Sequence, residues 1–84
     1  MAEGSPVDPT APEYVYRQVA DHIAAQIASG KLQPGARMPG ERDLAEQYGV
    51  AVGTARRAIQ ELRERHLVVT LPAKGTFVTN PPAS

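Results

Sequence analysis

Residues 49–65 read GVAVGTARRAIQELRER, and this stretch decides the fold. Placing its residues at 100° intervals gathers apolar side chains on one side of a helix: Ala55, Ala58, Ile59 and Leu62. The other side takes Gly53, Arg56, Arg57, Gln60 and Glu64. We therefore predict an amphipathic helix from about Val52 to Arg65, with one face in a core and the other in solvent.

A shorter helix is predicted just before this one, from Glu41 to Tyr48. Its apolar residues Leu44, Ala45 and Tyr48 share one face. Gly49 can take the left-handed conformation that ends a helix. Two helices joined by the three residues 49–51 make a helix-turn-helix.

Another helix is predicted upstream, from Tyr14 to about Ser29, with Gly30 as its stop. Its apolar residues recur at helical spacing: Tyr16, Val19, Ala20, Ile23, Ala24 and Ile27. This stripe supplies a second surface for the core.

The sequence after residue 66 predicts a β-hairpin. Residues 67–71 alternate as a strand with Leu67, Val69 and Leu71 on one face, residues 72–75 form a turn, and residues 76–79 form a second strand. Two strands are marginal alone, so the hairpin must pack on the helices. The expected fold is mainly α with a small β-hairpin, a three-helix winged helix-turn-helix at residues 14–79, between a flexible N-terminal tail (1–13) and a C-terminal tail (80–84).

Composition narrows the function classes. The 84 residues have no cysteine, which excludes disulfides and thiolate metal sites. No apolar run approaches the roughly 20 residues that span a bilayer. We expect no secretory signal, because residues 1–13 lack a positive region followed by an apolar stretch. The net charge is zero, but residues 1–50 carry four basic and seven acidic residues, whereas residues 51–84 carry five basic and two acidic ones. One positive face is therefore compatible with overall neutrality.

The exposed face of helix 52–65 has the chemistry to contact base pairs. A helix fits the DNA major groove, where arginine pairs with guanine edges and glutamine with adenine. Arg56, Arg57 and Gln60 supply these groups. Gly53 leaves the helix N-terminus open to a phosphate, and Lys74 at the hairpin tip can reach a phosphate or the minor groove.

These residues resemble the GntR-type bacterial regulators, which carry an N-terminal winged helix-turn-helix domain. The matching segments are YRQVADHIAAQIASGKLQPGARMPGERDLAEQYGV, GTARRAIQEL and HLVVTLPAKGTFV, which together cover about residues 14–79. The pattern G-x-L-x-P-G-x-x-x-P-x-E-R-x-L-A followed by G-T-F-V is much more specific than a helix-turn-helix alone.

The resemblance implies a sequence-specific duplex DNA-binding transcription regulator, and a repressor in particular. Helix 52–65 would lie in the major groove, flanked by the 67–79 wing. Arg42 corresponds to the arginine of the family's P-x-E-R segment, Thr54 and Arg56 to its recognition-helix residues, and Lys74 with Gly75 to its wing tip.

The chain departs from the family pattern at several positions. Ala51-Val52 stands where Ser-Arg usually opens the recognition helix, so a cap worth about 1 kcal/mol and a cationic contact are missing. Val52 can touch a thymine methyl or simply pack. Gly40, His66 and Ala73 replace a serine and two glycines, and His66 would need a left-handed backbone. We expect an altered operator or weaker binding.

Each predicted contact has a structural alternative. Arg56, Arg57 and Gln60 could form a solvated face, Arg42 could pair with Glu46 four residues on, and Lys74 could be an ordinary turn residue. His22 and His66 do not make a metal site, and we expect no metal, cofactor or catalytic residue.

The partner expected from the sequence is double-stranded DNA in the cytoplasm, with no membrane contact and no effector ligand on this segment. A homodimer on DNA is left open. The alternative function is a winged-helix module that binds a protein, such as an antirepressor.

Overall fold

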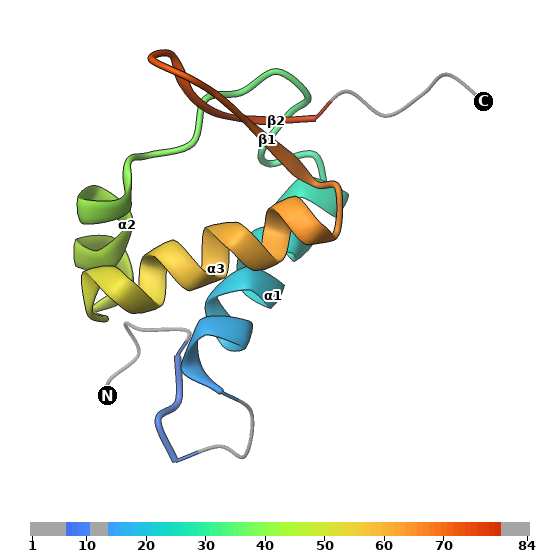
Figure 1. The fold of residues 1–84 in the computed structure, drawn as a ribbon. Helices are drawn as coiled ribbons and strands as arrows, with labels where there is room; N and C mark the ends of the chain where they lie inside the picture. Colours follow the sequence, from blue (N-terminus) through green and yellow to red (C-terminus); the bar gives the residue numbers. More distant parts are fainter. Residues whose placement is uncertain (1–6, 11–13, 80–84) are drawn as a thin grey trace.

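The computed structural model describes residues 7–10 and 14–79. The elements follow the order α1 (Val15–Ala28), α2 (Glu41–Tyr48), α3 (Val52–Glu64), β1 (Val68–Leu71) and β2 (Gly75–Val78). In Figure 1 α3 runs through the centre of the molecule, α2 lies beside its first turns, and the hairpin lies above it. The mainly helical fold with one hairpin that the sequence predicts is confirmed.

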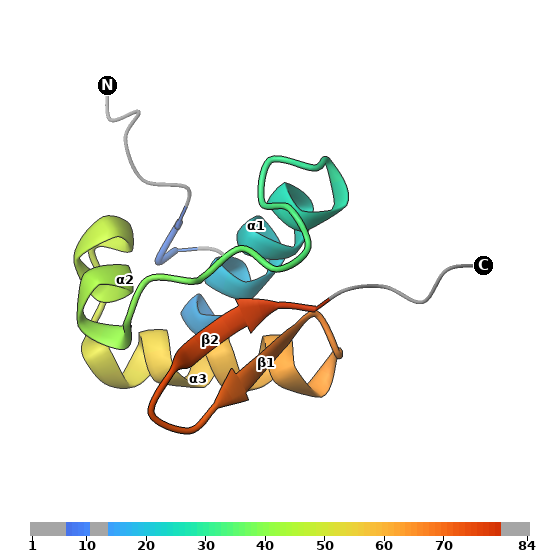
Figure 2. The ribbon, with the colours of Figure 1, turned by 90° about the horizontal axis from the view of Figure 1, so that it is seen from above.

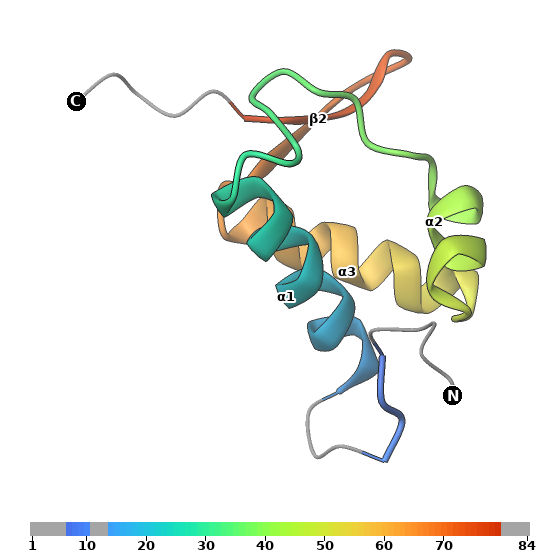
Figure 3. The ribbon, with the colours of Figure 1, turned by 180° about the vertical axis from the view of Figure 1, so that it is seen from behind.

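The core forms where the apolar stripes of the three helices meet. α1 contributes Val19, Ala20 and Ile23, and Figure 3 shows α1 crossing α3 from behind. The buried residues of the other two helices are those predicted: Leu44, Ala45 and Tyr48 from α2, and Ala55, Ala58, Ile59 and Leu62 from α3. The small alanines of α3 let α1 approach closely, which fixes the direction of the opposite face of α3.

The helix-turn-helix connection is built by Gly49 in the left-handed conformation, with φ at 66°. The backbone N–H of Val50 then donates to the carbonyl of Ala45, which closes the end of α2. Ala51 begins α3 without a side-chain cap, as its residue type predicts. Because α2 ends and α3 begins within a few residues, the last turn of α2 lies next to the first turn of α3.

The hairpin is attached to the helices through the loop before α2. β1 and β2 are antiparallel, with Val68 opposite Val78 and Leu71 opposite Gly75. The far edge of β2 pairs with the segment around Arg37: the N–H of Met38 donates to the carbonyl of Thr76 at 2.7 Å. Figure 2 shows this loop running beside β2. The loop therefore acts as a third, short strand that supports the wing.

The face of the hairpin that packs on the core is not the face of Val69 and Leu71, which the apolar alternation predicted. Val68 and Val78 are 3% exposed and pack in the core, whereas Val69 and Leu71 are 42% and 43% exposed. Leu67, which we expected on the face of Val69 and Leu71, precedes β1 and packs against the core while half-buried. Only one residue of β1 is buried, because the strand leaves the helices after its first position.

Within residues 7–10 and 14–79, two non-glycine residues hold left-handed backbones, His66 with φ at 63° and Ala73 with φ at 64°. The resemblance implies glycine at both positions. The backbone of this chain keeps the left-handed conformation there although the residues have side chains. A side chain in this region costs about 1–2 kcal/mol.

We expect Ala73→Gly to raise the free energy of unfolding by about 0.5–1 kcal/mol, because the relieved strain exceeds the entropy that glycine adds to the unfolded chain. Urea denaturation followed by circular dichroism measures this. Ala25→Gly, at an exposed position inside α1, is the matched control and should lower stability by about 1 kcal/mol. Equal losses from both variants would contradict strain at Ala73.

Part of the predicted tail lies against the domain. The N–H of Asp8 donates to Oε1 of Gln18 at 2.7 Å, and Nε2 of Gln18 donates to the carbonyl of Asp8 at 2.9 Å. Val7 and Pro9 border a cavity of about 440 Å³ beside Val50. The other tail residues, 1–6, 11–13 and 80–84, lie outside the described residues.

Candidate nucleic-acid interface

One exposed face of α3 carries a row of side chains that we call the α3 stripe: Val52, Arg56, Gln60 and Arg63. The spacings of four and three residues place them on successive turns of the same face. All four are exposed, and the Arg56 side chain is 62% accessible. Two arginines, an amide and an aliphatic side chain are thereby presented together to solvent.

The first turn of α3 has little bulk. Gly53 is exposed with open space around its Cα, and Thr54 is half-buried beside it. Their backbone N–H groups belong to the end of the helix where such groups have no helical acceptor. This end of α3 is therefore open to solvent.

Arg56 is held by a contact between two helices. Its Nε donates to Oε1 of Glu41 at 3.1 Å, and both side chains are largely exposed. An exposed pair of this kind contributes about 0–1 kcal/mol, so a base or phosphate can displace it at small cost. Glu41 thus orients the Arg56 guanidinium between α2 and α3 without burying it.

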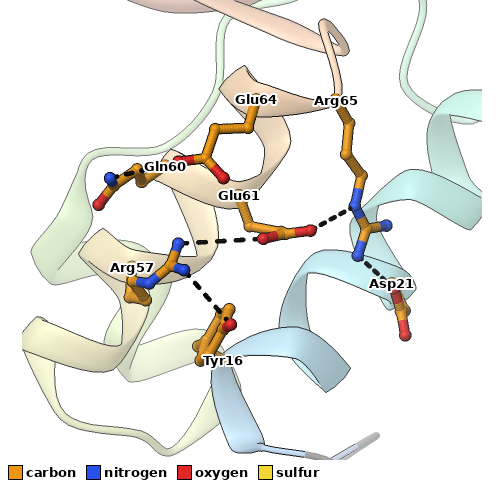
Figure 4. A network of polar contacts seen from close by, with 7 residues as sticks. All are labelled: Tyr16, Asp21, Arg57, Gln60, Glu61, Glu64 and Arg65. Atoms are coloured by element: carbon orange, nitrogen blue, oxygen red, sulfur yellow. Dashed lines mark hydrogen bonds and ion pairs between the residues drawn. The ribbon is translucent and has the colours of Figure 1, made fainter.

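Arg57 does not share the face of Arg56, contrary to its placement from the helical spacing. Its guanidinium carbon lies 4.3 Å from the centre of the Tyr16 ring, and Nη2 donates to the Tyr16 hydroxyl at 3.3 Å (Figure 4). Nη1 is buried, 3.9 Å from Oε1 of Glu61. The stacked and paired Arg57 side chain therefore joins α3 to α1.

The polar contacts between α3 and α1 continue from Arg57 toward the C-terminus of α3. Arg65 donates to Glu61 at 2.9 Å and to Asp21 on α1 at 2.8 Å (Figure 4). The bond to Asp21, followed by that to Glu61, raises the pKa of the Arg65 guanidinium above its ordinary value. Gln60 lies at the margin of this side, where Nε2 donates to Glu64 at 3.4 Å. Glu61 is thus directed away from the α3 stripe, whereas Glu64 lies next to Gln60 of the stripe.

Two other predicted cations are exposed and have no side-chain partner within the described residues. Arg42 lies in the first turn of α2, and its alternative pairing with Glu46 is not formed. Lys74 lies in the turn between β1 and β2, next to the half-buried Gly75. Both charges remain available to an external anion.

Two further arginines lie at this surface and were not among the residues predicted from the sequence. Arg63 closes the α3 stripe, and its Nη1 donates to Oγ1 of Thr70 on β1 at 3.0 Å. Arg37 lies across the wing: a Cβ added to Gly75 would come within 3.0 Å of its Nε. The spacing of seven residues from Arg56 could have revealed Arg63, whereas Arg37 lies in a loop without periodicity.

Other kinds of site find no support in the described part of the chain. It contains no group of three or more histidine, aspartate or glutamate side chains placed to hold a metal ion. Its helices are too short or too polar to cross a bilayer. His22 instead bonds to the Tyr48 hydroxyl at 2.7 Å, between α1 and α2.

Comparison with known protein families shows to which family the chain belongs. Residues 15–78 match the family described as bacterial regulatory proteins, gntR family. The chain belongs to this family. The gntR match covers α1 through β2, so the predicted resemblance is confirmed, together with the expectation that these residues form a regulatory module instead of an enzyme.

Among gntR relatives, the transcriptional repressor NagR of Bacillus subtilis is 36% identical over 75 residues, covering 89% of this chain and 31% of NagR. The repressor MngR of Escherichia coli, which is named for mannosyl-D-glycerate transport and metabolism, is 41% identical over 64 residues, covering 76% of this chain and 27% of MngR. The chain thus spans about a third of the length of these relatives.

A solved structure of the same fold contains DNA. The AraR DNA-binding domain in complex with operator ORE1 matches with a TM-score of 0.76 and 33% identity, covering 89% of this chain and 92% of that one. The named relatives are repressors and the structural relative is bound to an operator, which gives no support to the antirepressor alternative.

Proposed function

We propose that this chain is the sequence-specific duplex DNA-binding module of a transcriptional repressor. α3 lies in the major groove and the hairpin flanks it as a wing. The observation that carries the proposal is the α3 stripe with its exposed Arg56, together with Arg42 on α2 and Lys74 in the wing turn, two exposed cations that have no side-chain partner within the described residues. The operator-bound AraR domain, similar over almost all of its length, supports the same use of the fold.

The predicted residues take different roles in this proposal. Arg56 contacts a guanine edge, with Gln60 one turn further along the groove. Val52 touches a thymine methyl, and Thr54 contacts DNA from the first turn of α3. Contact by Arg57 is not part of the proposal, because it would break the Tyr16 stack.

The remaining predicted contacts are with the backbone and the minor groove. Gly53 admits a phosphate to the helix N-terminus, and Arg42 binds a phosphate from α2. Lys74 and Gly75 bring the wing tip to the adjacent minor groove. These contacts position the module and carry little sequence information.

The DNA-binding surface of a single module is small, and this size bears on the oligomeric state. One small module covers a half-site and binds it weakly, so a tight operator complex needs two copies on repeated half-sites. We propose that the chain binds DNA as a homodimer. We further propose that it acts in the cytoplasm and that residues 1–84 bind no effector.

Selection of a random-sequence duplex library by the 84-residue chain tests the proposed function. We expect a recovered motif whose affinity falls steeply between two salt concentrations, because phosphate contacts release counterions. Lys74→Ala should weaken binding to selected and scrambled duplexes alike and make the salt slope shallower by about one. Failure to recover any motif, with no salt-dependent binding, would exclude sequence-specific DNA binding.

A further inference from the structure

A cleft of about 180 Å³ lies at the base of the wing, between α3, the hairpin and the start of α2. We call it the wing-base cleft. Its polar lining comes from both strands, from α3 and from the loop before α2: Arg37, Glu41, Arg63, Thr70 and Thr76. None of the three basic residues to which the proposed function gives a contact, Arg42, Arg56 and Lys74, lines it.

The charge of the cleft favours an anion. Arg37 and Arg63 face one carboxylate, that of Glu41, which is already engaged by Arg56 at 3.1 Å. The Arg37 guanidinium has no hydrogen-bonded or ion-paired partner within the part of the chain that the structure describes. Arg63 bonds only to a neutral hydroxyl there, so two guanidinium charges remain uncompensated at the cleft.

The cleft is also held in shape before any ligand arrives. Arg63 donates to Thr70, and the hydroxyls of Thr70 and Thr76 bond to each other at 2.9 Å across the hairpin. The Arg37 side chain passes next to Gly75, where an added Cβ would come within 3.0 Å of its Nε. The bond to Thr70 reduces the side-chain entropy that Arg63 loses when an anion binds.

The position of the cleft identifies the anion. When a helix occupies the major groove and a hairpin the adjacent minor groove, one sugar–phosphate strand passes between the two elements. The wing-base cleft lies between α3 and the hairpin, where that strand must pass.

We propose that the wing-base cleft binds one backbone phosphate of duplex DNA through Arg37 and Arg63. The inference rests on the proposed function and extends it with two residues that carry affinity without sequence preference. In a chain that has Val52 where an arginine is usual, the proposal places cationic contacts near the end of α3 and in the loop before α2.

Single replacements of the two arginines test the cleft. We expect Arg37→Ala and Arg63→Ala each to weaken binding to the selected duplex and to a scrambled duplex by about tenfold, and to make the salt slope shallower by about one. Arg63→Lys should retain most of the slope, because it keeps the charge. Thermal unfolding of each variant checks that it remains folded.

Lys31→Ala is the matched control. Lys31 is exposed in the loop after α1 and does not line the cleft, so the variant loses one positive charge outside the cleft. We expect its affinity to stay within about twofold of the unaltered chain. If Arg37→Ala and Arg63→Ala bind like Lys31→Ala, the wing-base cleft does not contact DNA. A changed sequence preference in either variant would contradict a phosphate contact.

Neutral phosphates in the duplex give a test that does not depend on folding of the variants. Methylphosphonate substitution, moved along the selected duplex, should identify a backbone position where loss of charge weakens binding by the unaltered chain but not by Arg37→Ala/Arg63→Ala. If every sensitive position remains equally sensitive in the double variant, the cleft proposal is wrong while the proposed function stands. If the unaltered chain binds no duplex, both are wrong.

Discussion

Arg56→Ala is expected to relax the sequence preference of the chain. A good bidentate contact between arginine and guanine contributes about 1–3 kcal/mol of discrimination, so the selected duplex should lose about tenfold or more of its advantage over a duplex altered at one base pair. The exposed pair with Glu41 contributes little to stability, so the variant should unfold at nearly the same urea concentration. Competition binding with a panel of single-base variants measures the loss of preference.

Arg57→Ala is the matched control, because it removes the same charge from the next residue of α3. Its guanidinium stacks on Tyr16 and faces α1, so we expect sequence preference to be retained and stability to fall by about 0.5–2 kcal/mol. If Arg57→Ala relaxes preference and Arg56→Ala does not, the assignment of the α3 stripe is wrong.

Leu62→Ala is expected to have the largest effect on stability. Leu62 is fully buried on the core face of α3, close to where α3 joins the wing. Deleting such a side chain leaves a cavity and costs about 2–5 kcal/mol. For a domain of this size the melting temperature should fall by about 10 °C or more. Circular dichroism at 222 nm during urea and thermal unfolding measures both quantities.

Leu71→Ala makes the same chemical change at an exposed position of β1. We expect a change within about 0.5 kcal/mol, which is usual for surface positions. Comparable losses from the two variants would contradict the hairpin orientation described here, in which Val68 and not Leu71 faces the core.

The helical part of the fold could be predicted because its pattern is redundant. Ala55, Ala58, Ile59 and Leu62 all indicate the same face, and Gly49 marks the turn between α2 and α3. The face of the hairpin could not be predicted in the same way. Leu67, Val69 and Leu71 alternate with residues of which one, Val68, is also apolar, so two faces were compatible with the pattern.

Exposure of the residues of the proposed site could be predicted where position on α3 decides it, and could not be predicted where tertiary contacts decide it. Arg56 and Arg57 are the same residue type at adjacent positions. Their side chains differ in exposure because Tyr16 on α1 lies within reach of Arg57 only. Arg37 joins the site because its segment pairs with β2, a contact across about 40 residues that no local pattern contains.

We propose that the α3 stripe and the wing together form the surface that binds duplex DNA. Backbone amide chemical shifts of the labelled chain, recorded during titration with the selected duplex, test it most directly. We expect perturbations around Val52–Arg56, Arg63, Arg42 and the 72–75 turn, with little change at Asp21 and Ala25 on the exposed side of α1. Perturbations concentrated on α1, with the wing and the α3 stripe unchanged, would contradict this account.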